Sequence, residues 1–109
     1  MSVFIGSVVV NVSDAGRAAG FWCQALGYTP TTENPEFLAP RGGPGPRLHL
    51  DTGDRMHLDL WVDRKDSDLE TEVERLVALG ATRVDWDYPE GADFVVLSDT
   101  EGNLFCVIR

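Results

Sequence analysis

Apolar and polar residues alternate along the chain in two different periods, which predict a repeated order of strands and helices. The β-branched run Phe4–Val12 predicts a strand. Ala18, Phe21, Trp22 and Ala25 recur at helical spacing, so we predict a helix over about residues 15–26. Two short strands are predicted next, at Tyr28–Thr32 and at Phe37-Leu38 within Pro35–Pro40. A loop rich in glycine and proline follows at Arg41–Pro46, and a further strand is predicted at Arg47–Asp51.

The second half of the chain repeats this order. Met56–Val62 alternates cleanly, which predicts a strand with two distinct faces. Leu58, Leu60 and Val62 fall on one face, and His57, Asp59 and Trp61 fall on the other. Apolar residues at helical spacing from Leu69 to Val77 predict a second helix that closes at Gly80. Three more strands are expected, with a turn at Asp99–Asn103 before the last: Thr82–Trp86, Asp93–Ser98 and Leu104–Arg109.

The repeat predicts the fold class. Both expected helices end in the same tripeptide, Ala25-Leu26-Gly27 and Ala78-Leu79-Gly80. An internal repeat is more informative than a single motif, so we predict one α+β domain over residues 1–109. It would consist of two βαβββ modules, at about 1–53 and 54–109. The alternative is a generic α+β sandwich in which the two tripeptides match by chance.

Composition and charge narrow the range of partners. With 109 residues, 43% of them hydrophobic and 25% charged, the chain is typical of a soluble globular domain. The formal net charge of −9 argues against nucleic acid and against anionic membrane surfaces as partners. We find no secretory signal and no membrane-length apolar run, and we expect the two cysteines to be free thiols in a cytoplasmic protein.

Several motifs resemble those of the vicinal oxygen chelate superfamily, in its glyoxalase-like branch, which includes bleomycin-resistance-like proteins. In the first half these are Val12-Ser13-Asp14, Phe21-Trp22 and Leu26-Gly27-Tyr28. In the second half they are His57-Leu58-Asp59-Leu60, Leu79-Gly80-Ala81, Asp99-Thr100-Glu101-Gly102-Asn103 and Phe105-Cys106. The resemblance covers essentially the whole chain. It implies a mixed sheet that is cupped around a cavity for a small molecule, with a helix on the outer face of each half, and a homodimer.

The resemblance also implies where a divalent metal would bind. The matching positions are Ser7, His49, His57 and Cys106. A neutral hydroxyl at Ser7 is a poor ligand, and Cys106 stands where the family usually has glutamate. We therefore expect an incomplete metal site, with His57 as the best-matching ligand and His49 and Cys106 as the others if a metal binds. Without a metal, we expect Cys106 to be a buried, inert core thiol.

Several side chains are candidates for the wall of the ligand cavity. They are Ser7, Asn11, His49, His57, Asp59, Trp61 and Trp86. His57 could instead be a structural histidine or an acid–base group, and Asp59 could be a wall residue or a base. Trp61 offers a flat surface for stacking, whereas Trp86 would stand at a strand end. We expect the acidic residues from Asp63 to Glu74 to form a solvated helix face.

Three functions follow from these residues. The first is a protein that binds a small aromatic or hydrophobic molecule without a complete metal site, and the sequence favours it. The second is a divalent-metal-dependent lyase, isomerase or dioxygenase, in which the metal polarises an oxygen. The third is a metal-free enzyme that uses His57 as acid and base. The sequence does not decide whether the chain is an enzyme.

Overall fold

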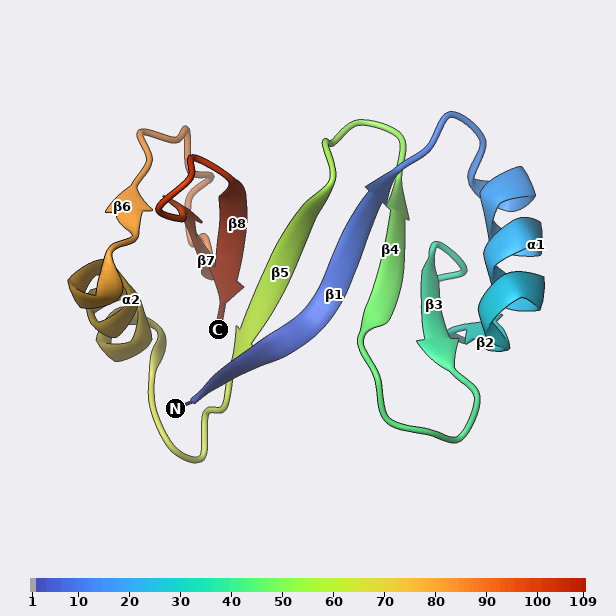
Figure 1. Ribbon diagram of the computed structural model, residues 1–109, viewed down its shortest axis with the longest axis horizontal. Helices are drawn as coiled ribbons and strands as arrows, with labels where there is room; N and C mark the ends of the chain where they lie inside the picture. The colour runs from blue at the N-terminus through green and yellow to red at the C-terminus, as the bar shows by residue number, and fades with distance from the viewer. Residues whose placement is uncertain (1) are drawn as a thin grey trace. The chain divides into compact units, whose positions relative to one another are not determined.

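The computed structural model describes residues 2–109 and contains two helices and eight strands in the order βαβββ, βαβββ. The predicted α+β class and the repeated order are confirmed. The elements are β1 (Val3–Asn11), α1 (Ala15–Leu26), β2 (Tyr28–Pro30), β3 (Phe37–Pro40), β4 (Arg47–Asp51), β5 (His57–Val62), α2 (Leu69–Leu79), β6 (Thr82–Arg83), β7 (Phe94–Ser98) and β8 (Leu104–Ile108). Figure 1 follows the chain through them.

The chain divides into two compact units. One contains Gly6–Met56, and the other contains His57–Arg109 together with the N-terminal residues up to Ile5. We call them the N-terminal unit and the C-terminal unit. In the first, the strand order is β2-β3-β4-β1, and in the second it is β5-β8-β7-β6. In both, the first strand pairs in parallel with the last, and the remaining neighbours are antiparallel. The repeat seen in the sequence is therefore a repeat of topology.

Each unit has its own core, between one helix and one face of its strands. In the N-terminal unit, the core contains Leu38, Leu48 and Leu50, and the partly buried side chains of Trp22 and Cys23 on α1 pack against it. In the C-terminal unit, the core contains Val62, Val73, Leu97 and Val107. Because side chains alternate along a strand, residues next to these core positions lie on the opposite face. We call that face of each unit its open face.

Both helices begin at a capping aspartate and end at a glycine. The Asp14 carboxylate accepts the Arg17 N–H at 3.0 Å, and the Asp68 carboxylate accepts the Thr71 N–H at 2.8 Å. The latter bond is the main cause that lowers the pKa of Asp68. Gly27 ends α1 at a φ of 70°, a left-handed conformation that favours glycine. These caps explain why both helix predictions are confirmed.

Four local predictions need correction. Leu58, which shares the predicted strand face of Val62 and was expected to lie under the outer helix, is 38% exposed. Cys106 is half-buried instead of buried. The strand expected over Thr82–Trp86 contains only two residues, so Trp86 lies in the following loop and is 43% exposed. Glu72 does not belong to a solvated face, because it is only 3% exposed.

The burial of Glu72 has a clear local cause. Its carboxylate accepts a hydrogen bond from the Ser67 hydroxyl at 2.7 Å and forms an ion pair with Arg75 at 3.0 Å. The Ser67 hydrogen bond is the main cause that lowers the pKa of Glu72, and it outweighs the opposite effect of burial. This carboxylate thus ties the start of α2 to the segment before it. Within residues 2–109, no helix is both long enough and apolar enough to span a membrane.

Candidate functional site

Strand β5 places three polar or aromatic side chains on the open face of the C-terminal unit. Val62 is buried in the core. Because side chains alternate along a strand, His57, Asp59 and Trp61 lie on the face opposite to Val62. Strand β8 runs parallel to β5, and the register pairs Asp59 with Cys106. Residues paired in register share a face of the sheet. Cys106 therefore joins the β5 side chains from the neighbouring strand.

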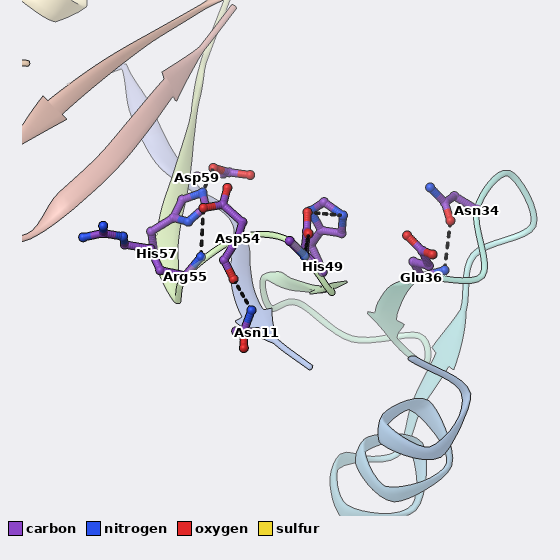
Figure 2. Close-up of polar contacts among 10 residues, drawn as sticks. Asn11, Asn34, Glu36, His49, Asp54, Arg55, His57 and Asp59 are labelled. Carbon is purple, nitrogen blue, oxygen red and sulfur yellow. Dashed lines mark hydrogen bonds and ion pairs between the residues drawn. The ribbon is translucent and has the colours of Figure 1, made fainter. Parts of the chain in front are cut away.

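The three polar side chains form a compact cluster. His57 Nε2 lies 3.1 Å from Asp59 Oδ1, and these side chains are only 9% and 14% exposed (Figure 2). Donor atoms of His57, Asp59 and Cys106 all lie within 4.8 Å of one another. We call this group the HDC cluster. Side chains two apart on a strand do not always touch, so the sequence predicted the shared face of His57 and Asp59 and left their contact open.

The donor set of the HDC cluster fits a divalent metal ion. Imidazole nitrogen, carboxylate oxygen and thiolate sulfur are the three kinds of ligand that zinc accepts in proteins. Atoms bound at about 2.0–2.3 Å from one ion lie about 3–4 Å apart. The His57–Asp59 separation of 3.1 Å is within that range, and the limit of 4.8 Å for the whole cluster requires only small side-chain adjustments. Asp59 is not among the ligand positions that the family motifs imply.

An aromatic side chain lies farther along the same strand. Trp61 contacts Phe4 edge to face, with ring centroids 6.0 Å apart and an angle of 76° between the planes. Edge-to-face packing favours one orientation of the two rings relative to each other. The predicted cavity-wall residues of β5 therefore lie in a row on one face: a polar pair and then an indole.

Of the other predicted site residues, Trp86 lies in the loop after β6, and Ser7, Asn11 and His49 lie in the N-terminal unit. His49 stacks on Phe37 with ring centroids 4.1 Å apart, and its Nε2 lies 3.8 Å from Asp51 Oδ2. The Asn11 amide donates to the Asp54 carbonyl at 2.5 Å (Figure 2). These residues form a second polar group on strands β1 and β4.

Ser7 is an unusual member of that unit. Its side chain is 1% exposed, and Ser7 Oγ has no hydrogen-bond partner among residues 2–109. A buried hydroxyl without a partner is unfavourable, so Ser7 is a departure from ordinary packing. Arg47, which pairs with Ser7 in register, holds its guanidinium carbon 4.4 Å from the Phe37 ring centroid.

Some residues of these faces were not predicted from the sequence. Arg47 and Phe37 were missed, although the alternation in Arg47–Asp51 already places Arg47 on the face of His49. Tyr88 and Phe94 were also missed. Tyr88 lies in the loop before β7 and Phe94 begins that strand; their ring centroids are 5.4 Å apart, and no sequence motif signals that contact.

Comparisons with known proteins agree with this architecture. A family model described as "Glyoxalase-like domain" matches residues 7–108. The chain therefore belongs to the glyoxalase-like domain family, within the vicinal oxygen chelate superfamily that its motifs resemble. None of the curated proteins matches the chain.

A comparison with solved structures finds a similar fold. The crystal structure of methylmalonyl-CoA epimerase from Mycobacterium tuberculosis is 19% identical, with a TM-score of 0.60, over 95% of this chain and 85% of that one. A glyoxalase/bleomycin resistance protein from Streptomyces sp. CB03234 is 21% identical, with a TM-score of 0.38, over 97% of this chain and 100% of that one. A glyoxalase-related enzyme from Fulvimarina pelagi is 23% identical, with a TM-score of 0.37, over 96% of this chain and 86% of that one.

Proposed function

We propose that this glyoxalase-like domain binds a small molecule through a divalent metal ion held by the HDC cluster. The observation that carries the proposal is the convergence of three chemically different donors, from His57, Asp59 and Cys106, within 4.8 Å. We expected an incomplete metal site because we considered only the ligand positions that the family resemblance implies. Asp59 supplies a further ligand beyond those positions, so we now favour the metal-dependent function.

The chain's own residues prepare the cluster for this role. Asp59 orients the His57 imidazole through the 3.1 Å contact, and burial of both side chains lowers the local dielectric. Once bound, a divalent ion would supply Lewis acidity toward an oxygen atom of the ligand.

A second candidate function is binding of an aromatic molecule without a metal. The observation that favours it is the position of Trp61 on the same strand face as His57, with its orientation set by Phe4. An indole of fixed orientation is a suitable stacking surface for a planar apolar molecule. In this case His57 and Asp59 would supply hydrogen bonds to the polar end of the ligand.

Metal analysis of protein purified without a histidine tag separates the two functions. The metal-dependent function predicts about one equivalent of a divalent transition metal in the wild type and a loss of most of it in His57→Ala. The matched control is His49→Ala, which removes the other histidine and should keep the metal. If the wild type takes up no zinc after dialysis against zinc, the metal-dependent function is wrong. A change in tryptophan fluorescence with metal-free protein and an aromatic ligand, lost in Trp61→Phe, would then support the second candidate.

A further inference from the structure

The C-terminal unit contains a pocket at the edge of strand β7 that the proposed function does not use. The two-residue strand β6 pairs with β7 only up to Arg83, and the chain then leaves the sheet. The last contact is a long hydrogen bond of 3.3 Å from the Val84 N–H to the Val96 carbonyl. Beyond it lies a cavity of about 330 Å³, within the usual range for small-molecule sites. Its lining consists of Arg83, Val84, Tyr88, Ala92, Phe94 and Val95.

Tyr88 closes the strand edge that β6 leaves open. Its Oη accepts the Val96 N–H at 2.8 Å, so the side chain replaces the missing strand as the partner of that amide. The phenol keeps its own hydrogen for a further acceptor. The Tyr88 ring also lies 5.4 Å from the Phe94 ring, tilted by 57°. Two aromatic rings thus form one wall of the pocket.

The chemistry of the pocket favours an uncharged ring. Five of its six lining residues are apolar or aromatic. The remaining one, Arg83, already donates to the Glu70 carboxylate at 2.7 Å. A ligand carboxylate would have to compete with Glu70, whereas a neutral ring would gain apolar contacts and aromatic stacking with Tyr88 and Phe94.

The register of the sheet connects this pocket to the HDC cluster. Val96 pairs with Cys106, and Phe94 pairs with Ile108. Phe94 is two residues from Val96, so it lies on the same face as Cys106, at the diagonal position. Diagonal neighbours on antiparallel strands are about 7–8 Å apart. One small molecule can therefore span from Cys106 to the Phe94 ring.

We propose that this pocket binds the aromatic ring of the ligand whose oxygen-bearing end reaches the metal ion at the HDC cluster. The inference rests on the proposed function and extends it, because it gives the ligand class: an uncharged aromatic ring joined by a short link to an oxygen-donor group. Tyr88 and Phe94 contact the ring, and Ala92 leaves the space for it.

The test uses three hydroxamic acids, which share one metal-binding group. Acetohydroxamate lacks a ring, whereas benzohydroxamate and 3-phenylpropanohydroxamate carry one at two distances. Isothermal titration of the zinc-loaded protein should show that at least one aromatic compound binds tenfold or more tightly than acetohydroxamate. Ala92→Leu, which fills the pocket, and Phe94→Leu should each remove most of that preference and leave acetohydroxamate binding unchanged. Ala78→Leu, at an exposed position of α2, is the matched control and should keep the preference.

The outcomes separate the two proposals. If all three compounds bind with equal affinity, or if Ala92→Leu keeps the preference, the pocket proposal is wrong and the metal site stands. If none of the three binds to zinc-loaded protein, or if the protein takes up no zinc, the proposed function is wrong and the pocket proposal is overturned with it. Acetohydroxamate binding reports on the metal site in each variant. A misfolded variant is therefore recognised because it no longer binds acetohydroxamate.

Discussion

His57 Nε2 lies 3.1 Å from Asp59 Oδ1, although the two residues are not adjacent in sequence. Neighbouring positions on one face of a strand are about 6.5–7 Å apart at the backbone, so the contact requires the side chains to cover that distance. Their low exposure makes this contact more effective than the same pair would be in water. The contact orients the imidazole and brings a carboxylate oxygen to the position where Cys106 also offers a ligand.

The first prediction concerns that carboxylate. Asp59→Asn keeps the size of the side chain but removes its charge and one oxygen, so zinc affinity should fall at least as much as the roughly 10–100-fold that loss of an outer-shell partner costs. A competition titration with a chromogenic chelator measures the change. The matched control is Asp51→Asn, which alters the looser His49–Asp51 pair, 3.8 Å apart, and should leave zinc affinity unchanged. Equal effects of the two substitutions would contradict the assignment of Asp59.

The buried carboxylate of Glu72 predicts a dependence of stability on pH. Its pKa is lowered in the folded protein, so the folded state binds the Glu72 proton less strongly than the unfolded state does. The stabilisation is therefore complete well above the ordinary carboxyl pKa of about 4.3 and is lost as the pH falls through the lowered value. At pH 7, Glu72→Gln should lower the free energy of unfolding by about 1–3 kcal/mol.

Urea unfolding across a range of pH checks this prediction. The difference between wild type and Glu72→Gln should narrow as the pH falls below about 4.3. Glu74→Gln, at an exposed position of the same helix, should show little difference at any pH. A constant difference between wild type and Glu72→Gln from pH 7 to pH 3 would show that the charge of Glu72 is not what stabilises the fold.

Two glycines of the first half should respond to alanine in opposite directions. Gly27 ends α1 at a φ of 70°, where a β-carbon costs about 1–2 kcal/mol, so Gly27→Ala should lower stability by that amount. Gly20 lies inside α1, and a β-carbon there would meet no atom within 4 Å. Gly20→Ala should raise stability by about 0.5–1 kcal/mol. Thermal unfolding measures both, and a destabilised Gly20→Ala would contradict the account of α1.

Tyr88→Phe tests whether the phenol replaces a missing strand. The substitution keeps the ring and removes the acceptor of the Val96 N–H, so it should cost about 1 kcal/mol of stability. Amide hydrogen exchange should accelerate more at Val96 than at Val107, because the core amide of Val107 responds only to the loss of overall stability. Unchanged exchange at Val96 would mean that the Tyr88 hydroxyl does not protect this edge.

Periodicity and the glycine-ended helices were enough to predict the repeated βαβββ order, because each strand and helix of this chain carries a local signal. The alternation in Met56–Val62 also predicted that His57, Asp59 and Trp61 share a face. The approach of Cys106 to that face could not be predicted in the same way. It depends on the parallel register between β5 and β8. That register is determined by contacts between residues that are far apart in the sequence.

The errors have the same origin. Glu72 reads as a surface residue from its place in an acidic segment, but Ser67 and Arg75 satisfy its carboxylate and allow it to be buried. The strand expected to reach Trp86 ends at Arg83, since Tyr88 supplies the hydrogen bond that a longer strand would have made. In both cases, a side-chain contact overrides the local pattern.

Cobalt binding tests most directly whether His57, Asp59 and Cys106 bind one metal ion. A thiolate bound to Co²⁺ produces a charge-transfer absorption band in the near ultraviolet, which no other ligand of the cluster can supply. Cobalt-loaded wild type should show this band, Cys106→Ser should lose it, and Cys23→Ser, which removes the other cysteine, should retain it. A wild-type protein without the band, or a band that survives in Cys106→Ser, would contradict the proposed metal site.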